Sequence, residues 1–266
     1  MKDKDFNFKK QFGQNFIFDK NFLNSLVEGF CLPSDINVLE IGAGMGTLST
    51  TLASNFRNVL SFEIDKTLTE HLQALESDNL KFVFKDILKQ DIQEIEDYFG
   101  KENYYMIANL PYYITSQIIF KFLLETTKLS SMFVMVQREV GERFCALPGG
   151  KDYGVPSALL ATFSNCKIVK FVPRKMFVPQ PNVDSCIIRI DIDRTKYVIS
   201  DIKKYSDFVS KCFQMKRKTL MNNLTKMGKE KTICINALEE LGLNLSVRPE
   251  QLSAEQFVKL FDLLSR

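Results

Sequence analysis

The chain has 266 residues, of which 45% are hydrophobic and 25% are charged, and its net charge is +3. This composition is ordinary for a globular protein, and the length suits one large domain and a small one. No apolar run approaches the roughly 20 residues of a membrane span, and Met1 to Asp5 do not begin a signal peptide. Six cysteines without a Cys-x-x-Cys pair argue against a zinc site and for thiols in a reducing cytoplasm.

The amino-terminal residues 1–18 are unusually aromatic, with five Phe between positions 6 and 18. A terminus rarely exposes so much ring surface, so this segment is expected to fold back over the body as a lid. Asp19 is then expected to cap a helix that runs to about Phe30 with one apolar face.

Apolar runs predict five successive strands, at 36–41, 58–64, 80–84, 104–108 and 132–136. Helical patterns lie between them, from residue 47, at 68–75 and from about 114, and a further helix is expected at 155–163. This alternation predicts an α/β fold with a mostly parallel, doubly wound sheet. Residues 168–172 and 186–192 are expected to form a hairpin at the sheet edge.

The sequence pattern after residue 200 predicts helices at 201–213, 218–224, 233–241 and 254–264. We therefore predict one domain over 1–196 and a small all-α domain over 197–266. From Lys167 to Arg266 there are 19 Lys and Arg against 11 Asp and Glu, whereas the remainder holds 16 against 21. This basic excess favours a polyanionic partner, although a solvated basic face is the plain alternative.

A glycine loop of the form E-x-G-x-G-x-G covers Glu40 to Gly46, after the first strand and before a helix. Glycine lets the backbone approach a ligand closely, and Glu63, near the end of the second strand, can bind ribose hydroxyls. A dinucleotide fingerprint requires G-x-G-x-x-G, but Gly46 comes one place early. The loop therefore favours S-adenosylmethionine over a nicotinamide cofactor, with Asp86 expected to accept from its adenine amine.

The tetrapeptide Asn109-Leu110-Pro111-Tyr112 follows the fourth strand. It offers an amide, a backbone carbonyl and an aromatic ring, and Pro111 stiffens the backbone without adding a donor. Acceptors beside a ring suit a planar, amino-bearing nucleobase. An ordinary strand-to-helix turn is the alternative, because Asn and Pro are common in turns.

Five stretches of the chain carry a resemblance to a known family. They are Gln11-Phe12-Gly13-Gln14-Asn15-Phe16, the Glu40–Gly46 loop, the Asn109–Tyr112 tetrapeptide, Phe177-Val178-Pro179-Gln180-Pro181-Asn182-Val183-Asp184-Ser185, and Lys216-Arg217-Lys218-Thr219-Leu220 with Asn222-Asn223-Leu224. Over nearly its whole length the chain resembles the KsgA-type small-subunit ribosomal RNA adenine dimethyltransferases.

The resemblance implies a class I methyltransferase (Rossmann-like) fold with a helical rRNA-binding domain. It implies that the chain dimethylates N6 of two adjacent adenosines near the 3′ end of small-subunit rRNA, in the cytoplasm, as a monomer and without a metal. It assigns cofactor contacts to Asn15, Ile17, Gly42, Gly44, Glu63, Asp86 and Asn109. It assigns the target amine to Asn109 and Leu110, and stacking on the target adenine to Tyr112 and Phe177.

Two departures from the family pattern concern the pocket rim, where Tyr113 replaces a frequent Asn and Gln180 stands at a variable place. An Erm-type methyltransferase of large-subunit rRNA is a close alternative, against which Val183-Asp184-Ser185 and Arg248-Pro249-Glu250 speak. A mainly non-catalytic ribosome assembly factor is a second alternative. His71, the only histidine, is expected on an exposed helix face.

Overall fold

The fold was analysed in a computed structural model that describes residues 15–215 and 217–265. The expected lid over residues 1–18 therefore lies largely outside the described residues. Backbone contacts divide the chain into two compact units. The first comprises the chain up to residue 138 together with 168–189, and the second comprises 139–167 and 190–266.

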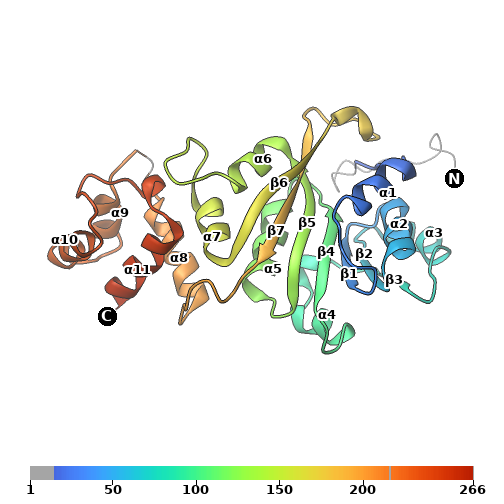
Figure 1. The fold of residues 1–266 in the computed structure, drawn as a ribbon, viewed down its shortest axis with the longest axis horizontal. Coiled ribbons are helices and arrows are strands. Elements are labelled where there is room, and N and C mark those ends of the chain that lie inside the picture. The colour runs from blue at the N-terminus through green and yellow to red at the C-terminus, as the bar shows by residue number, and fades with distance from the viewer. Residues whose placement is uncertain (1–14, 216, 266) are drawn as a thin grey trace. The chain divides into compact units, whose positions relative to one another are not determined.

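The chain forms a seven-stranded sheet in the order β3-β2-β1-β4-β5-β7-β6, with β1 to β5 and most of β6 and β7 in the first unit (Figure 1). The strands are β1 (Asn37–Ile41), β2 (Asn58–Phe62), β3 (Leu80–Val83), β4 (Tyr104–Asn109), β5 (Leu129–Gln137), β6 (Ser164–Val172) and β7 (Ser185–Ile192). β1 pairs in parallel with β2 and β4, β2 pairs in parallel with β3, and β4 does so with β5. The predicted mostly parallel sheet is thus confirmed, and the two segments predicted at its edge are the neighbouring strands β7 and β6.

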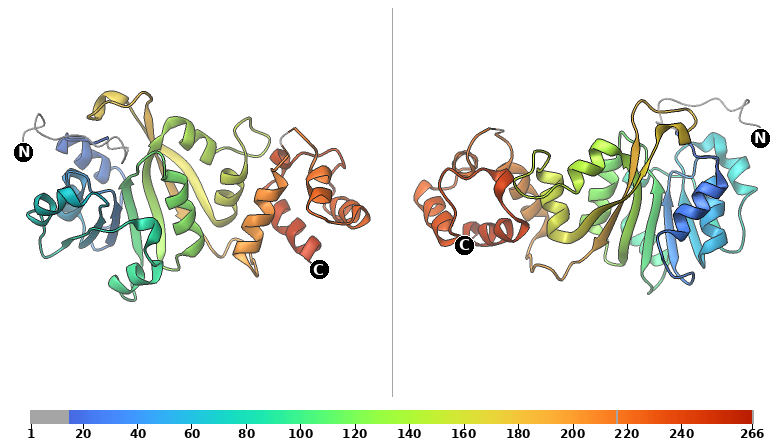
Figure 2. Two further views of the ribbon diagram at one scale, coloured as in Figure 1. Left: turned by 180° about the vertical axis from the view of Figure 1, so that it is seen from behind. Right: turned by 45° about the horizontal axis from the view of Figure 1, so that its top comes forward.

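Helices cover both faces of this sheet, as Figures 1 and 2 show. They are α1 (Lys20–Glu28), α2 (Thr47–Asn55), α3 (Thr69–Gln73), α4 (Ile92–Tyr98) and α5 (Thr115–Glu125), with short 3-10 helices η2 (Lys66–Leu68), η3 (Ile87–Lys89) and η4 (Arg174–Met176). The predicted cap of α1 is confirmed, because Asp19 accepts a hydrogen bond from the Phe22 amide at 3.0 Å. A strand such as β1, buried at all five positions, needs this cover on both faces.

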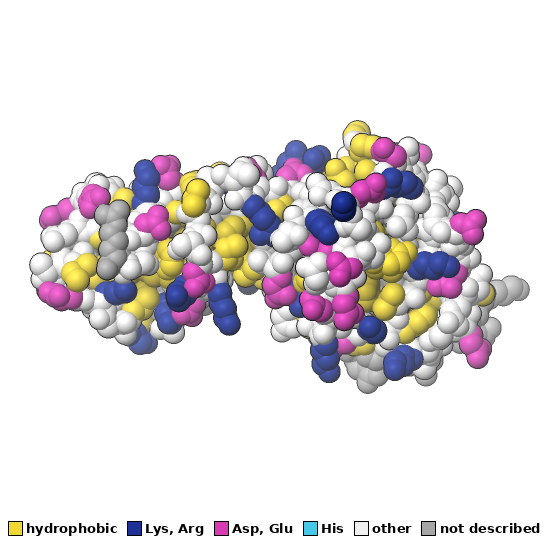
Figure 3. Space-filling model, turned by 90° about the horizontal axis from the view of Figure 1, so that it is seen from below, with side chains coloured by type: hydrophobic (Ala, Val, Ile, Leu, Met, Phe, Trp, Pro, Cys, Tyr) yellow, Lys and Arg dark blue, Asp and Glu magenta, His cyan; other side chains and the backbone are white. Residues whose placement is uncertain are grey.

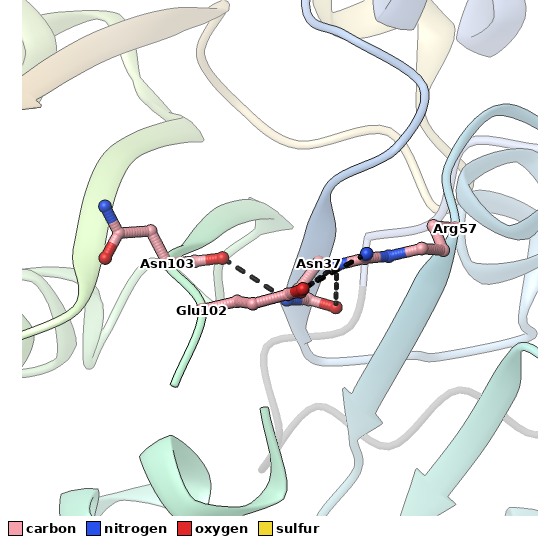
Figure 4. Close-up of polar contacts among 4 residues, drawn as sticks. All are labelled: Asn37, Arg57, Glu102 and Asn103. Carbon is pink, nitrogen blue, oxygen red and sulfur yellow. Dashed lines mark hydrogen bonds and ion pairs between the residues drawn. The ribbon is translucent and has the colours of Figure 1, made fainter. Parts of the chain in front are cut away.

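One polar cluster joins the amino ends of β1, β2 and β4 (Figure 4). The Asn37 side chain donates to the Glu102 carboxylate at 3.0 Å and to the Asn103 carbonyl at 3.3 Å. Arg57 donates to both Asn37 and Glu102, and its hydrogen bond holds the pKa of Glu102 below the usual value. Asn37 is the first residue of β1 and pairs with Asn58 and Tyr104, the first residues of β2 and β4. The amino ends of the three strands are therefore aligned. Their carboxyl ends consequently meet at one edge of the sheet.

Helices form most of the second unit: α6 (Arg138–Phe144, from its second residue), α7 (Val155–Phe163), α8 (Ile202–Cys212), α9 (Leu220–Lys226), α10 (Lys231–Glu240) and α11 (Ala254–Ser265), with the 3-10 helix η5 (Pro249–Gln251). Phe257, Leu260, Phe261 and Leu264 of α11 are buried on one face of that helix, and the rings of Phe261 and Tyr205 pack edge to face. Tyr205 also shares a 2.9 Å hydrogen bond with Thr162 of α7. By its contacts α7 therefore belongs with the carboxyl-terminal helices, and the functional boundary at 196/197 stays a prediction.

Charges of both signs are interspersed on the face that Figure 3 displays. That pattern fits the small net charge of +3. None of the helices within 15–215 and 217–265 has the length and hydropathy that a membrane span needs.

Candidate active site

The carboxyl ends of four parallel strands open into one cavity of the first unit, here called the strand-end cavity. In a parallel sheet this edge is where ligands bind, because each strand delivers its following loop there. The residues predicted to bind or react that line it are Asn15, Gly42, Gly44, Glu63, Asp86, Asn109, Leu110 and Tyr112. The structure thus gathers side chains that lie up to 97 positions apart in the sequence.

The glycine loop turns sharply at the end of β1. Gly42 and Gly44 have φ angles of 84° and 55°, a region where other residues are strained. The amides of Gly42 and Ala43 both donate to the Phe62 carbonyl, at 2.8 and 3.1 Å. The ring of Phe16 lies so close to Gly44 that a β-carbon there would overlap it. The loop is therefore a backbone cradle that only glycine can form beside that ring.

His71 supports the far end of this loop, contrary to the expected exposed position. Its Nε2 lies 3.1 Å from the Met45 carbonyl, and the side chain is half-buried. Helix periodicity placed His71 on a polar face, but the glycine loop packs against that face. The contact joins residues 26 positions apart, which no local pattern reveals.

Glu63 is a buried carboxylate that faces the glycine loop. Its Oε2 accepts from the Gly44 amide at 2.8 Å, and its Oε1 accepts from the amides of Ile64 and Asp65, both at 2.8 Å. Burial raises the pKa of Glu63, while the three backbone donors act in the opposite direction. These bonds orient the carboxylate, and each oxygen can accept more than one donor. Glu63 can therefore receive hydroxyl groups of a ligand in the strand-end cavity.

Glu40, the first residue of the glycine motif, lies wholly inside the protein. Its Oε2 accepts from the hydroxyls of Ser49 and Ser61, both at 2.5 Å. Its Oε1 has no hydrogen-bond partner among the described residues. Burial raises the pKa of Glu40 to about 7, with a smaller contribution from the charge of Glu63. Glu40 therefore ties β1, α2 and β2 together beneath the loop rather than facing a ligand.

Asn109 ends β4 at the wall of the strand-end cavity. Its Nδ2 donates to the backbone oxygen of Asn15 at 2.8 Å. This bond engages the donor end of the amide, so Oδ1 is the end that can accept from a ligand. Leu110, which follows, is buried and lines the same cavity. The structure thus places both residues of the predicted acceptor pair in one cavity wall.

Tyr112 is held by a residue that sequence reasoning missed. Its hydroxyl lies 2.8 Å from the Ser185 hydroxyl, at the start of β7. Ser185 is fully buried and Tyr112 is half-buried, so the ring stands at the cavity with its polar tip fixed. Partial burial raises the pKa of Tyr112, which keeps the phenol neutral at physiological pH. A neutral, oriented ring is suited to stacking on a base.

Asp86 and Tyr113 form the other side of the cavity. Asp86 accepts from the Leu88 amide at 3.0 Å through Oδ1, and its Oδ2 lies 3.9 Å from the Lys89 ammonium. Tyr113 is exposed but lines the same cavity, and partial burial followed by the charges of Asp86 and Glu63 raises its pKa. The ring of Tyr113 therefore lies near both carboxylates, on the rim where the sequence placed it.

Two predicted site residues do not line the strand-end cavity. Ile17 lies in an adjoining apolar cavity, which also has Gly42 and Asn109 in its wall. Phe177 belongs to the hydrophobic core, with a side-chain exposure of only 2%, and is not among the residues lining either cavity. Its neighbour Val178 pairs with Phe16 through backbone hydrogen bonds of 2.9 and 2.8 Å. The Phe177 segment thus reaches the site through its backbone.

The mostly parallel sheet, the glycine loop and the polar groups at the strand ends together define a class I methyltransferase fold. The sequence profile of the ribosomal RNA adenine dimethylases matches residues 5–266, and the chain belongs to that family. The resemblance seen in the sequence is thus confirmed. No group of three or more potential metal ligands occurs in the part of the chain that the structure describes.

Curated relatives and solved structures agree with this family. The small-subunit rRNA methyltransferases A of Bacillus mycoides and Bacillus cereus are each 40% identical over 97% of this chain and 92% of theirs. The 23S rRNA methyltransferase ErmE is 27% identical with a TM-score of 0.70, over 95% of this chain and all of the other. A dimethyladenosine transferase from Plasmodium falciparum shares the fold, with a TM-score of 0.79 at 24% identity over 94% and 98% of the two chains.

Proposed function

We propose that this chain transfers methyl groups from S-adenosylmethionine to N6 of two adjacent adenosines near the 3′ end of small-subunit rRNA. The observation that carries the proposal is the pair of acceptors at Asn109 and Leu110, beside the Tyr112 ring and opposite the glycine loop. An amine with two N–H groups and a planar ring matches these features. Family membership and the 40% identical relatives support the same substrate class.

The residues of the strand-end cavity fit a nucleoside cofactor. The glycine cradle admits a ligand close to the backbone, Glu63 would hold the ribose hydroxyls, and Asp86 would accept from the adenine amine. Ile64, exposed to 42% at the cavity wall, offers an apolar face to a ring. Asn15 and Ile17, from the segment beside the loop, would bind the methionine end. When bound, this cofactor supplies a methyl group already activated by a positive sulfur, so no metal is needed.

The target amine is a weak nucleophile because its lone pair is delocalised into the adenine ring. Oδ1 of Asn109 and the Leu110 carbonyl would accept its two N–H bonds, and this favours a pyramidal nitrogen with a localised lone pair. Fixed dipoles of this kind lower a barrier through positioning and electrostatics, without a charged catalytic base. Asn109 is held for this role by its bond to Asn15.

The target adenine must leave its stack to enter the site, which costs a few kcal/mol. Tyr112 would offset that cost by stacking, worth roughly 1–3 kcal/mol per base. Stacking by Phe177 remains part of the proposal, and it requires the side chain to leave the core in which it lies. Crystals of the protein with an adenosine analogue would show whether Phe177 turns outward.

Residues 197–266 are proposed to bind rRNA, with exposed cations such as Arg217 and Lys218 against phosphates. Affinity for the RNA should then fall steeply as salt rises. We also propose that the enzyme acts as a monomer in the cytoplasm. None of its six cysteines forms a disulfide, which suits a reducing compartment. Light scattering of the purified protein tests the monomer.

A labelled methyl-transfer assay on small and large ribosomal subunits from an unmethylated strain tests the proposal. We expect label in the small subunit with the wild type and none with Asn109→Ala, while S-adenosylmethionine still binds measurably to the variant. Label in the large subunit alone would instead favour the activity named for ErmE. Binding of small subunits without any transfer would favour the assembly factor.

A further inference from the structure

The segment that connects the two last strands of the sheet exposes an unusual amount of apolar surface. Of the eleven large hydrophobic side chains exposed in the described chain, four lie between positions 169 and 183: Val169, Phe171, Val178 and Val183. Phe171 lies on β6, the strand at the edge of the sheet, and its side chain is exposed to 54%. Such clustering is typical of a surface that meets a partner. We call residues 168–184 the edge segment.

The edge segment is also basic. Lys170, Arg174 and Lys175 are exposed, and Asp184 is its only acidic residue. The Asp184 carboxylate accepts from the Arg174 amide at 2.9 Å, so it is engaged in holding the turn. The guanidinium of Arg138 lies over the Phe171 ring, 5.0 Å from its centre. The Lys170 ammonium lies over the Phe22 ring, 5.3 Å from its centre. An exposed aromatic ring with cations near it is an arrangement that binds single-stranded nucleic acid.

The carboxyl end and the middle of this surface lead to the strand-end cavity within the first unit. Ser185, the residue after Asp184, contacts the hydroxyl of Tyr112. In the middle, Val178 pairs with Phe16, whose ring lies against Gly44 in the cavity wall. A strand of RNA with its target base at Tyr112 would therefore pass directly onto the edge segment.

We propose that the edge segment is the docking surface for the nucleotides that flank the target adenosine. A flanking base stacks on the Phe171–Arg138 pair, and phosphates contact Lys170, Arg174 and Lys175. This inference rests on the proposed function and adds the location of the flanking strand. The partner is RNA rather than an apolar protein surface, because the cations Lys170, Arg174 and Lys175 lie among the exposed side chains of Val169, Phe171 and Val178.

Two variants of the edge segment test this inference, each with a matched control. Phe171→Ala removes the stacking ring, and Lys170→Ala/Lys175→Ala removes two cations. Tyr98→Ala and Lys101→Ala/Lys128→Ala make the same kinds of change near the amino ends of β4 and β5, away from the cavity. Thermal unfolding and calorimetric S-adenosylmethionine affinity should be unchanged in all four, which shows that fold and cofactor site are intact.

The measured quantities are affinity for small-subunit RNA across a salt series and methyl transfer. We expect Phe171→Ala to weaken RNA binding about tenfold, and the lysine variant to lower the slope of log affinity against log salt by about 1.4. Wild-type values in both variants, or equal losses in the controls, would overturn the inference. So would binding of small subunits through this segment with no salt dependence, which indicates protein contact. Wild-type enzyme that transfers no methyl group to unmethylated small ribosomal subunits would instead refute the proposed function.

Discussion

The side chain of Asn109 donates to the backbone oxygen of Asn15 across 2.8 Å, joining the end of β4 to the amino-terminal segment. An ionised aspartate has no donor for this bond. Asn109→Asp should therefore lower methyl transfer roughly a hundredfold, the scale on which one positioned dipole acts. S-adenosylmethionine affinity should also fall, because Asn15 loses its anchor. Asn103→Asp is the control, since Asn103 lies just before β4 and accepts from Asn37 through its backbone oxygen, and it should leave both quantities unchanged.

Gly44→Ala should lower the affinity for the cofactor, an effect beyond the loss of stability that backbone strain causes. A β-carbon at position 44 would overlap the Phe16 ring, so that ring must leave the cavity wall. Gly100→Ala provides the control, because Gly100 has a similar positive φ of 68° but no atom within 4 Å of the added carbon. Both variants should lose about 1 kcal/mol of stability from the left-handed backbone, as chemical unfolding measures. Only Gly44→Ala should lose cofactor affinity in calorimetry; equal affinities would contradict the cradle.

The hydrogen bond between Tyr112 and Ser185 should orient the ring for catalysis. Ser185→Ala and Tyr112→Phe each remove the 2.8 Å contact, and each is expected to lower kcat about tenfold through misplacement of the target base. If one bond explains both effects, the double variant should be no worse than either single variant. Ser54→Ala removes a hydroxyl that bonds only within α2 and serves as the control. Additive losses in the double variant would show that the two side chains act separately.

The stability of the protein should decrease with rising pH because of Glu40. Burial raises its pKa from 4.5 to about 7 in the folded protein. Between these values the unfolded chain has released a proton that the folded chain retains, so rising pH favours unfolding. The loss amounts to about 3 kcal/mol by pH 7, at roughly 1.4 kcal/mol per pKa unit. Below pH 4.5 the effect vanishes.

Glu40→Gln removes this titration while keeping a similar shape. Relative to the wild type, the variant should therefore gain about 3 kcal/mol between pH 4.5 and 7. Urea unfolding at a series of pH values measures the difference. Parallel profiles for the two proteins would mean that Glu40 has the same pKa in the folded and the unfolded protein.

Much of the fold was predictable because it follows from local patterns. The five apolar runs became β1 to β5, and their alternation with helices was enough to infer the parallel sheet. Helices α4 and α6, of seven residues each, were missed, although the equally short α9 was predicted. The strand ends were located by the same patterns, which is why the residues lining the strand-end cavity could be predicted.

Contacts between distant parts of the chain could not be predicted in this way. Ser185 lies 73 positions from Tyr112, and although it ends the family stretch that starts at Phe177, no local pattern reveals its contact with Tyr112. His71 was read from the period of its own helix, whereas the loop that covers it comes from 26 positions earlier. The stacking role of Phe177 stays a prediction, because a family role says what a side chain touches when ligands are bound and not where it packs without them.

The pairing of Phe16 with Val178 links the two ligands of the proposed reaction. These residues exchange two backbone hydrogen bonds, so a displacement of one residue displaces the other as well. RNA that shifts Val178 would thereby move the Phe16 ring, which lies against Gly44. A nucleoside that moves this ring would in turn change the position of Val178 and of the RNA bound there. Thermodynamic linkage makes such an effect reciprocal: each ligand would change the affinity for the other by the same factor.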